Sequence, residues 1–321
     1  MPLICSEWQK SPYWNIVLLA LAWALTLSTS TLLTTVGPLS AKELHQSNSL
    51  AAFTIGIFMM GAAVSSVPSG WLFRTYGRFW GFALGCLFQL VGSLLGTLAL
   101  ESGEPAWLYL GCFSVGLAQG LGQFYRFSAV EITPPHLKSR AVTYVLSGGI
   151  IAAFLGPSAA NYSIHIFSTE YIGSYLCIAV FAALNMLVLL LVNFPPKPES
   201  KTIESNVQSP RDVRRSSVPA AVTPSVEHSS SPVVRSAYEI CTNYMFILSC
   251  AIATLAHTIM VMVMSNITVD MEDNSYTFSA CSLVMELHFF AMFSPGMCYS
   301  ARYDYDPHAS LAPAFLLWQA S

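Results

Sequence analysis

The sequence predicts an all-α fold, a bundle of helices that crosses a lipid bilayer several times. Apolar side chains make up 54% of the 321 residues, and charged side chains make up only 10%. A soluble domain usually carries about 25% charged residues, so this chain has too little charge to cover a surface that faces water. The apolar residues gather in long runs, and a helix needs about 20 of them to cross the hydrocarbon core. Lipid is therefore the predicted solvent for most of the chain.

Eight apolar runs are long enough to be spans, and each is expected to be a helix because lipid tolerates no unpaired backbone. They cover residues 13–36, 50–70, 79–100, 106–126, 141–161, 171–193, 240–265 and 277–298. The predicted organisation is a cytoplasmic N-terminus (1–12), a six-helix half (13–193), a linker (194–236), a partial second half of two helices (237–298) and an atypical, truncated tail (299–321). The linker is rich in Ser and Pro and has few large apolar residues, which predicts disorder.

The basic residues predict the orientation of the spans. With the N-terminus in the cytoplasm, all but one of the 14 Lys and Arg residues fall on the cytoplasmic side, and Lys42 is the exception. Positive charge favours the cytoplasmic side of a membrane protein. An integral, multi-pass protein with a cytoplasmic N-terminus is therefore expected, whereas span length does not choose between the plasma membrane and an organelle.

Composition and spacing exclude several function classes. A net charge of -3 gives no reason to expect a nucleic-acid partner. The eight cysteines form no CxxC pair and lie mostly in apolar runs, so we interpret them as small core residues and expect no metal site. The chain contains no phosphate-binding loop, zinc-ligand spacing or serine-triad frame, so we expect neither an enzyme nor a bound cofactor. The expected partners are the bilayer and a small-molecule solute, with protons as a second possible cargo; the oligomeric state is left open.

Residues 70–80 are expected to form a short basic loop between two spans, and they resemble a known transporter motif. Gly70, Leu72, Gly77 and Arg78 match the pattern Gly-x-Leu-x-Asp-Arg-x-Gly-Arg-Arg/Lys, found between helices 2 and 3 of the major facilitator superfamily. Arg74 stands where that family has Asp. The resemblance implies a secondary transporter with two six-helix halves joined by a central loop, working by alternating access.

Three further segments support the resemblance. Gln119-Gly120 is similar to the family's helix 4 motif, although Gly116 replaces the Arg that usually precedes the Gln by three residues. Gly156-Pro157 resembles the helix 5 motif of the family's antiporter branch. The stretch from His288 to Pro295, His-Phe-Phe-Ala-Met-Phe-Ser-Pro, resembles a helix 8 segment of one microbial subgroup.

Ionisable residues inside apolar spans are candidates for solute or proton binding, because such groups are costly in a membrane. Glu286, His288 and His257 are of this kind. Glu286 and His288 are about 200° apart on a helix, so they are not expected to face one cavity. The alternative for each histidine is a structural hydrogen bond to a neighbouring backbone carbonyl.

Hydroxyl groups on the first span are a second set of candidates. Ser28, Thr31 and Thr35 share one helix face and would either line a solute path or bond neighbouring helices. Arg126 and Glu131 are candidates for a cytoplasmic gate, with headgroup contact and a structural ion pair as the alternative.

The predicted function is the transport of a small solute, with proton coupling as one form of it. The alternative is a non-transporting or regulatory membrane protein, or an inactive truncated transporter fragment. The family's Asp is thought to hold a charge contact that Arg74 reverses. Either another partner such as Glu131 rebuilds that contact or this chain lacks it.

Overall fold

A computed structural model describes residues 12–45, 48–133, 138–164, 166–167, 169–194 and 241–305. These residues form helices and no strands, which confirms the all-α prediction. Contacts divide the chain into two units: residues 256–321 belong with residues 1–195, and residues 196–255 form the other. The predicted linker (194–236), the tail beyond residue 305 and the first 11 residues lie almost entirely outside the described ranges.

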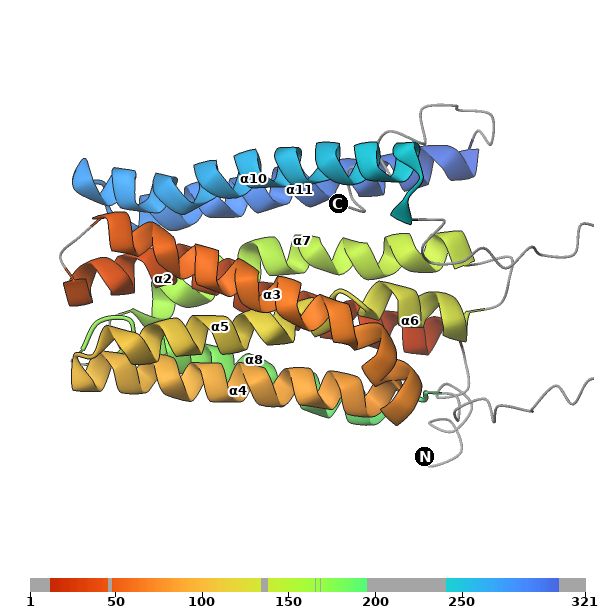
Figure 1. The fold of residues 1–321 in the computed structure, drawn as a ribbon, viewed down its shortest axis with the longest axis horizontal. Helices are drawn as coiled ribbons and strands as arrows, with labels where there is room; N and C mark the ends of the chain where they lie inside the picture. The colour runs from red at the N-terminus through yellow and green to blue at the C-terminus, as the bar shows by residue number, and fades with distance from the viewer. Residues whose placement is uncertain are drawn as a thin grey trace, which may run out of the picture. The chain divides into compact units, whose positions relative to one another are not determined.

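Among the described residues, seven helices come from the first 195 residues and two from later in the chain (Figure 1). In order they are α2 (Pro12–His45), α3 (Asn48–Tyr76), α4 (Arg78–Ser102), α5 (Pro105–Gly122), α6 (Tyr125–Ile132), α7 (Lys138–Ser163), α8 (Ile172–Leu191), α10 (Tyr244–Asp273) and α11 (Phe278–Tyr305).

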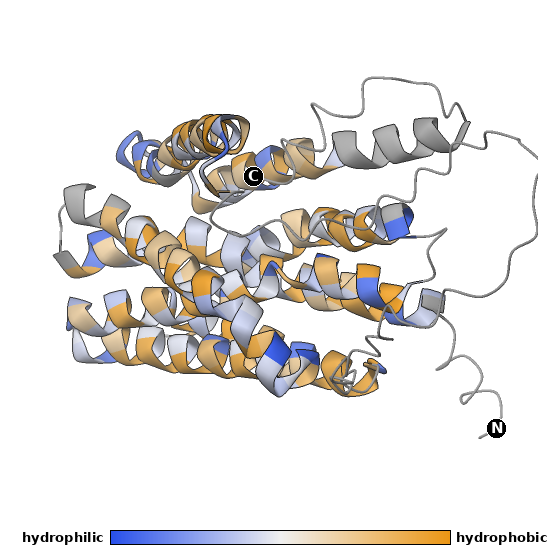
Figure 2. Ribbon diagram, turned by 45° about the vertical axis from the view of Figure 1, so that its right-hand side comes forward, coloured by the Kyte–Doolittle hydropathy of each residue, from blue (hydrophilic) through white to orange (hydrophobic). Residues whose placement is uncertain are grey.

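Within the described residues, six segments are long and apolar enough to cross a membrane: Tyr13–Leu44, Phe53–Tyr76, Arg78–Ser102, Arg140–Ser163, Ile172–Leu191 and Tyr244–Asp273. The other two predicted spans correspond to α5, which has 18 residues, and to a shorter apolar stretch of α11, Phe278–Ser294. Hydrophobic residues run along the helices, and the most hydrophilic residues lie near the helix ends (Figure 2).

Helix α2 lies at the centre of the larger unit. It packs against α3, α5, α6, α7, α8 and α11. Of its most apolar window, 83% is buried, against 28–44% for the candidate spans of α3, α4, α7 and α8. The outer helices therefore keep an exposed apolar face, as expected of helices in contact with lipid, while α2 is enclosed by protein.

Glycines allow α3 and α5 to approach closely. A Cβ on Gly116 would overlap the carbonyl oxygen of Phe58, and a Cβ on Gly120 would overlap the carbonyl oxygen of Ala62. The Gly116-x-x-x-Gly120 spacing is thus a helix-packing contact, as the sequence predicts. It also gives a physical reason for glycine at position 116, where an arginine side chain would not fit against α3.

Two predicted boundaries are wrong. Residues 70–76 are helical rather than part of a loop, and Gly77 alone separates α3 from α4. Gly77 has φ +89°, a value that residues with a Cβ rarely adopt. The predicted span 106–126 is also broken: α5 ends at Gly122 and α6 begins at Tyr125 after a turn. The pattern of apolar residues predicts neither of these helix ends, because each consists of a single short turn.

Gly116→Ala should lower the free energy of unfolding by about 1–3 kcal/mol, because the new methyl group would push α3 away from α5. Gly70→Ala is the matched control, since a Cβ built there has no atom within 4 Å apart from its chain neighbours and the nearby backbone of its own helix. Unfolding of the two variants in mixed micelles would measure the difference. Equal stability of both variants would show that the α3–α5 contact is looser than described.

Candidate functional site

The helices of the larger unit run back and forth, so its charged residues gather at two ends. The basic end is where α3 ends and where α4 and α7 begin (Figure 1). The opposite, acidic end is where α2 and α4 end. The basic end holds Arg74, Arg78, Arg126, Lys138 and Arg140, whereas the acidic end holds Glu43, Glu101, Glu104, Glu170, Glu272 and Asp273 with a single Lys or Arg in the described residues, Lys42.

An ion pair joins α4 to α6 at the basic end. Arg78 donates from Nε to Glu131 Oε2 at 2.9 Å and from Nη2 to Glu131 Oε1. The guanidinium also lies over the ring of Phe73 in α3, 5.1 Å from its centroid. A two-bonded pair of this kind fixes the orientation of both side chains, so three helices are tied together at this end.

Arg74 does not take the place of the family's acidic residue in this contact. Its Nε donates to the Gly70 carbonyl of its own helix at 3.2 Å, and its side chain is exposed. Glu131, considered above as its partner, pairs with Arg78 instead. Arg126 lies over the ring of Phe127, at 5.3 Å.

A second ion pair lies at the acidic end, and sequence reasoning missed it. Lys42 Nζ lies 2.9 Å from Glu272 Oε2 and 2.5 Å from Asp273 Oδ1. The contact joins the end of α2 to the end of α10, across 230 residues of sequence. Lys42 stood out in the sequence only as the one basic residue on its side.

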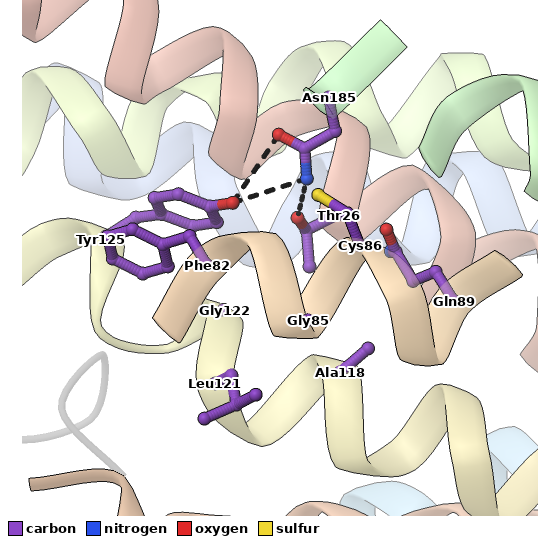
Figure 3. Close-up of a pocket in the computed structure, with 10 residues that line it drawn as sticks. All are labelled: Thr26, Phe82, Gly85, Cys86, Gln89, Ala118, Leu121, Gly122, Tyr125 and Asn185. Atoms are coloured by element: carbon purple, nitrogen blue, oxygen red, sulfur yellow. Dashed lines mark hydrogen bonds between the residues drawn. The ribbon is translucent and has the colours of Figure 1, made fainter. Parts of the chain in front are cut away.

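Four neutral polar side chains line one interior hollow and are called here the inner polar cluster: Thr26, Gln89, Tyr125 and Asn185 (Figure 3). Asn185 donates from Nδ2 to Thr26 Oγ1 at 2.9 Å, and the Tyr125 hydroxyl donates to Asn185 Oδ1 at 3.4 Å. The ring of Tyr125 stacks on Phe82, 4.1 Å between centroids.

The hollow beside this cluster has no room for a water molecule. All four polar side chains are at most 3% exposed. A buried amide without a hydrogen bond is costly, and the two bonds of Asn185 offset that cost. We therefore interpret the cluster as a structural link between α2, α6 and α8.

The sequence did contain a signal for the inner polar cluster. Asn185 is the single polar residue in α8 after Tyr175. Such a residue in an otherwise apolar helix is expected to bond inside the protein. Tyr125 and Thr26 carried no comparable signal, because other polar residues lie within three positions of each.

Glu286 contacts a helix from the first part of the chain. Ser158 Oγ of α7 donates to Glu286 Oε1 of α11 at 2.6 Å, and the two helices pack along much of their length. The carboxylate is partly buried within the apolar stretch Phe278–Ser294. Of the three ionisable candidates, Glu286 is thus the one with a hydrogen bond across a helix interface.

The two histidine candidates lie elsewhere. His288 is half-buried, its ring meets the edge of Phe289, and its Nε2 has no hydrogen-bond partner among the described residues. His257 lies on an exposed face of α10. The structure brings neither into contact with the Glu286–Ser158 pair.

The hydroxyl groups of α2 lie within helix contacts. Ser28, Thr31 and Thr35 are fully buried, and each donates to a carbonyl of α2. Thr31 Oγ1 also lies 3.2 Å from the carbonyl oxygen of Ala152 in α7. Their geometry therefore matches the helix-bonding alternative rather than an open solute path.

Gly156 and Pro157 lie in α7 on the opposite side of this contact. A Cβ on Gly156 would overlap Thr31 Oγ1 and lie 2.6 Å from the Ser28 carbonyl oxygen. Pro157 lies inside the helix without ending it. Position 156 thus requires glycine for packing against α2.

Comparison with known proteins gives a consistent assignment. The profile of the Major Facilitator Superfamily matches residues 17–303. Riboflavin transporter RfnT of Brucella anthropi is 26% identical over 282 residues, which are 88% of this chain and 64% of the relative. Uncharacterized MFS-type transporter YdeG of Bacillus subtilis is 22% identical over 268 residues, 82% of this chain and 58% of the relative.

A third relative matches over a shorter region. Galactose-proton symporter of Escherichia coli is 27% identical over 130 residues, 39% of this chain and 27% of the relative. No solved structure gives a significant match. The chain spans less than two thirds of the length of each of these relatives. Since the family match runs from α2 into α11, this chain is a multi-pass integral membrane protein of the Major Facilitator Superfamily.

Proposed function

We propose that this protein takes part in moving a small, neutral, polar solute across a membrane by alternating access, with a proton bound at Glu286. The observation that carries the proposal is the Ser158–Glu286 contact, a carboxyl group held inside an apolar stretch at the α7–α11 interface. Family membership supports transport as the activity. The relatives named for riboflavin and for galactose support a neutral, hydroxyl-rich solute.

The chemistry of Glu286 suits a coupling site. A charged carboxylate at this depth is costly, and protonation removes the cost. Protonation also changes the hydrogen bonds that Glu286 can make with Ser158. The ionised carboxylate only accepts hydrogen bonds, whereas the neutral carboxyl group can also donate one. Proton binding would thus alter a contact between α7 and α11. An equilibrium between two arrangements shifts when a ligand binds one of them more tightly.

The ion pairs support the two-ended geometry that alternating access needs. Arg78–Glu131 ties the basic end, and Lys42 ties α2 to α10 at the acidic end. We place the basic end in the cytoplasm, because positive charge favours that side. The Lys42 contact joins the first half to the later part of the chain and would break when the acidic end opens, whereas the Arg78–Glu131 pair lies within the first half and would orient its helices.

Glu286→Gln should abolish the stimulation of solute uptake by a pH gradient, because the amide cannot bind the coupled proton. Uptake of labelled riboflavin and of labelled galactose into vesicles that contain the full chain is the measurement, with and without an imposed gradient. Glu104→Gln, an exposed carboxylate before α5, is the matched control. Gradient-stimulated uptake that survives Glu286→Gln would remove Glu286 from the mechanism.

Charge reversal should test the ion pair at the basic end. Arg78→Glu alone should lower the free energy of unfolding by about 1 kcal/mol or more, because two carboxylates would then face each other. The double change Arg78→Glu with Glu131→Arg should recover much of that loss. Lys138→Glu, at the same end of the protein, is the control. A double variant no more stable than Arg78→Glu would show that the pair contributes no specific contact.

A further inference from the structure

Helix α3 carries an exposed stripe whose chemistry changes along its length. Met60, Val64, Val67 and Trp71 follow one another at i, i+4, i+7 and i+11 and therefore share a face. All four are more than half exposed, with Val67 at 86% and Trp71 at 57%. Arg74 comes next on this face, one turn beyond Trp71. The order along the stripe is hydrocarbon, then aromatic ring, then cation.

Helix α4 repeats this order from the other side of Gly77. Trp80, Leu87, Leu94 and Leu98 share a face, and Trp80 is 67% exposed. Trp80 lies near the start of α4, as Trp71 lies near the end of α3, so both indoles lie at the basic end. Hydrophilic residues interrupt the hydrophobic colour of both helices at this junction (Figure 2).

This order matches the depth profile of a bilayer leaflet. Aliphatic side chains face the hydrocarbon, and indole rings prefer the headgroup level. Arginine side chains reach past that level toward phosphate. Both helices show the order expected when the α3–α4 junction lies at the membrane–water boundary.

The two arginines of the junction differ in what they face. Arg78 is held by Glu131, so its charge is already paired. No carboxylate among the described residues lies within ion-pair distance of Arg74. Its Nε donates to Gly70, its side chain is exposed, and the exposed Trp71 and Trp80 lie three and six residues from it in the sequence. An unpaired guanidinium at headgroup depth favours an anionic, phosphate-bearing group.

We propose that the α3–α4 junction binds the headgroup of an anionic phospholipid, with Arg74 on the phosphate and Trp71 and Trp80 at headgroup level. Arg74 gives the site its preference for negative charge. The two indoles anchor the junction at this depth whatever the headgroup charge. The site does not depend on solute transport, and it uses the position at which the family pattern would place an acid.

Lipid retention by the detergent-purified full chain tests the proposal. Native mass spectrometry would count bound phosphatidylglycerol and phosphatidylcholine over a titration of each. Arg74→Gln should weaken the tightest phosphatidylglycerol binding by about fivefold, the effect of one arginine at a charged membrane surface. Phosphatidylcholine binding should not change, and Arg74→Lys should retain most of the preference because lysine also binds phosphate.

Arg140→Gln is the matched control, since it removes an exposed arginine at the basic end away from the two indoles. An equal loss in Arg140→Gln would show a general charge effect and overturn the site. Unchanged phosphatidylglycerol binding by Arg74→Gln would also overturn it. Competition by inorganic phosphate as strong as that by the lipid would indicate a free-anion site instead. Elution of each variant at the wild-type volume in size-exclusion chromatography would confirm folding.

Discussion

The close packing of α7 between α2 and α11 is the constraint on which the rest of the structure depends. One face of α7 presents Gly148, Ala152 and Gly156 to α2, and a Cβ at either glycine would overlap α2 atoms. Another face presents Gly149 to Phe293 and Ser158 to Glu286, both on α11. Helix α7 therefore packs against α2, at the centre of the bundle, on one side and against α11, from the later part of the chain, on the other.

The two faces of α7 differ in the chemistry of their contacts. Small side chains and backbone carbonyls form the face toward α2, and these groups do not change charge with pH. The face toward α11 presents Ser158 to the carboxyl group of Glu286, which belongs to α11. Under the proposed mechanism, a proton bound at Glu286 would alter the α7–α11 contact and leave the α2–α7 contact as it is. The buried hydroxyl group of Thr31 in α2 contacts the α2-facing side of α7 at the carbonyl oxygen of Ala152.

The sequence predicted the helical spans well, because twenty-residue apolar runs are a direct consequence of bilayer thickness. The Gly116–Gly120 packing was also predictable, since spacing alone brings those glycines to one helix face. The glycine-led turn at Gly77 was not placed correctly, because the residues before it have the composition of either a helix or a loop. A basic composition alone does not end a helix.

The site could be predicted only in part. Glu286 stood out because an acid in an apolar run is costly, and it remains the leading candidate. Its partner Ser158 lies 128 residues away, and Asn185 bonds Thr26 across 159 residues. One sequence gives no information on such pairs. Glu131 was considered as a partner of Arg126 or of Arg74, but it pairs with Arg78, a choice that depends on how α4 lies against α6.

Distances between spin labels would show whether proton binding at Glu286 changes the α7–α11 contact and leaves the α2–α7 contact unchanged. Tyr162 on α7 and Leu283 on α11 are exposed and report on the α7–α11 face, while Val17 on α2 and Tyr144 on α7 report on the α2–α7 face. The measurement compares vesicles at pH 5 and pH 8. We expect the distance distribution of the Tyr162–Leu283 pair to differ between the two pH values and that of the Val17–Tyr144 pair to stay the same. In Glu286→Gln, the difference for the first pair should be lost. A pH-dependent change in the α2–α7 pair, or an α7–α11 distance that stays constant, would contradict it.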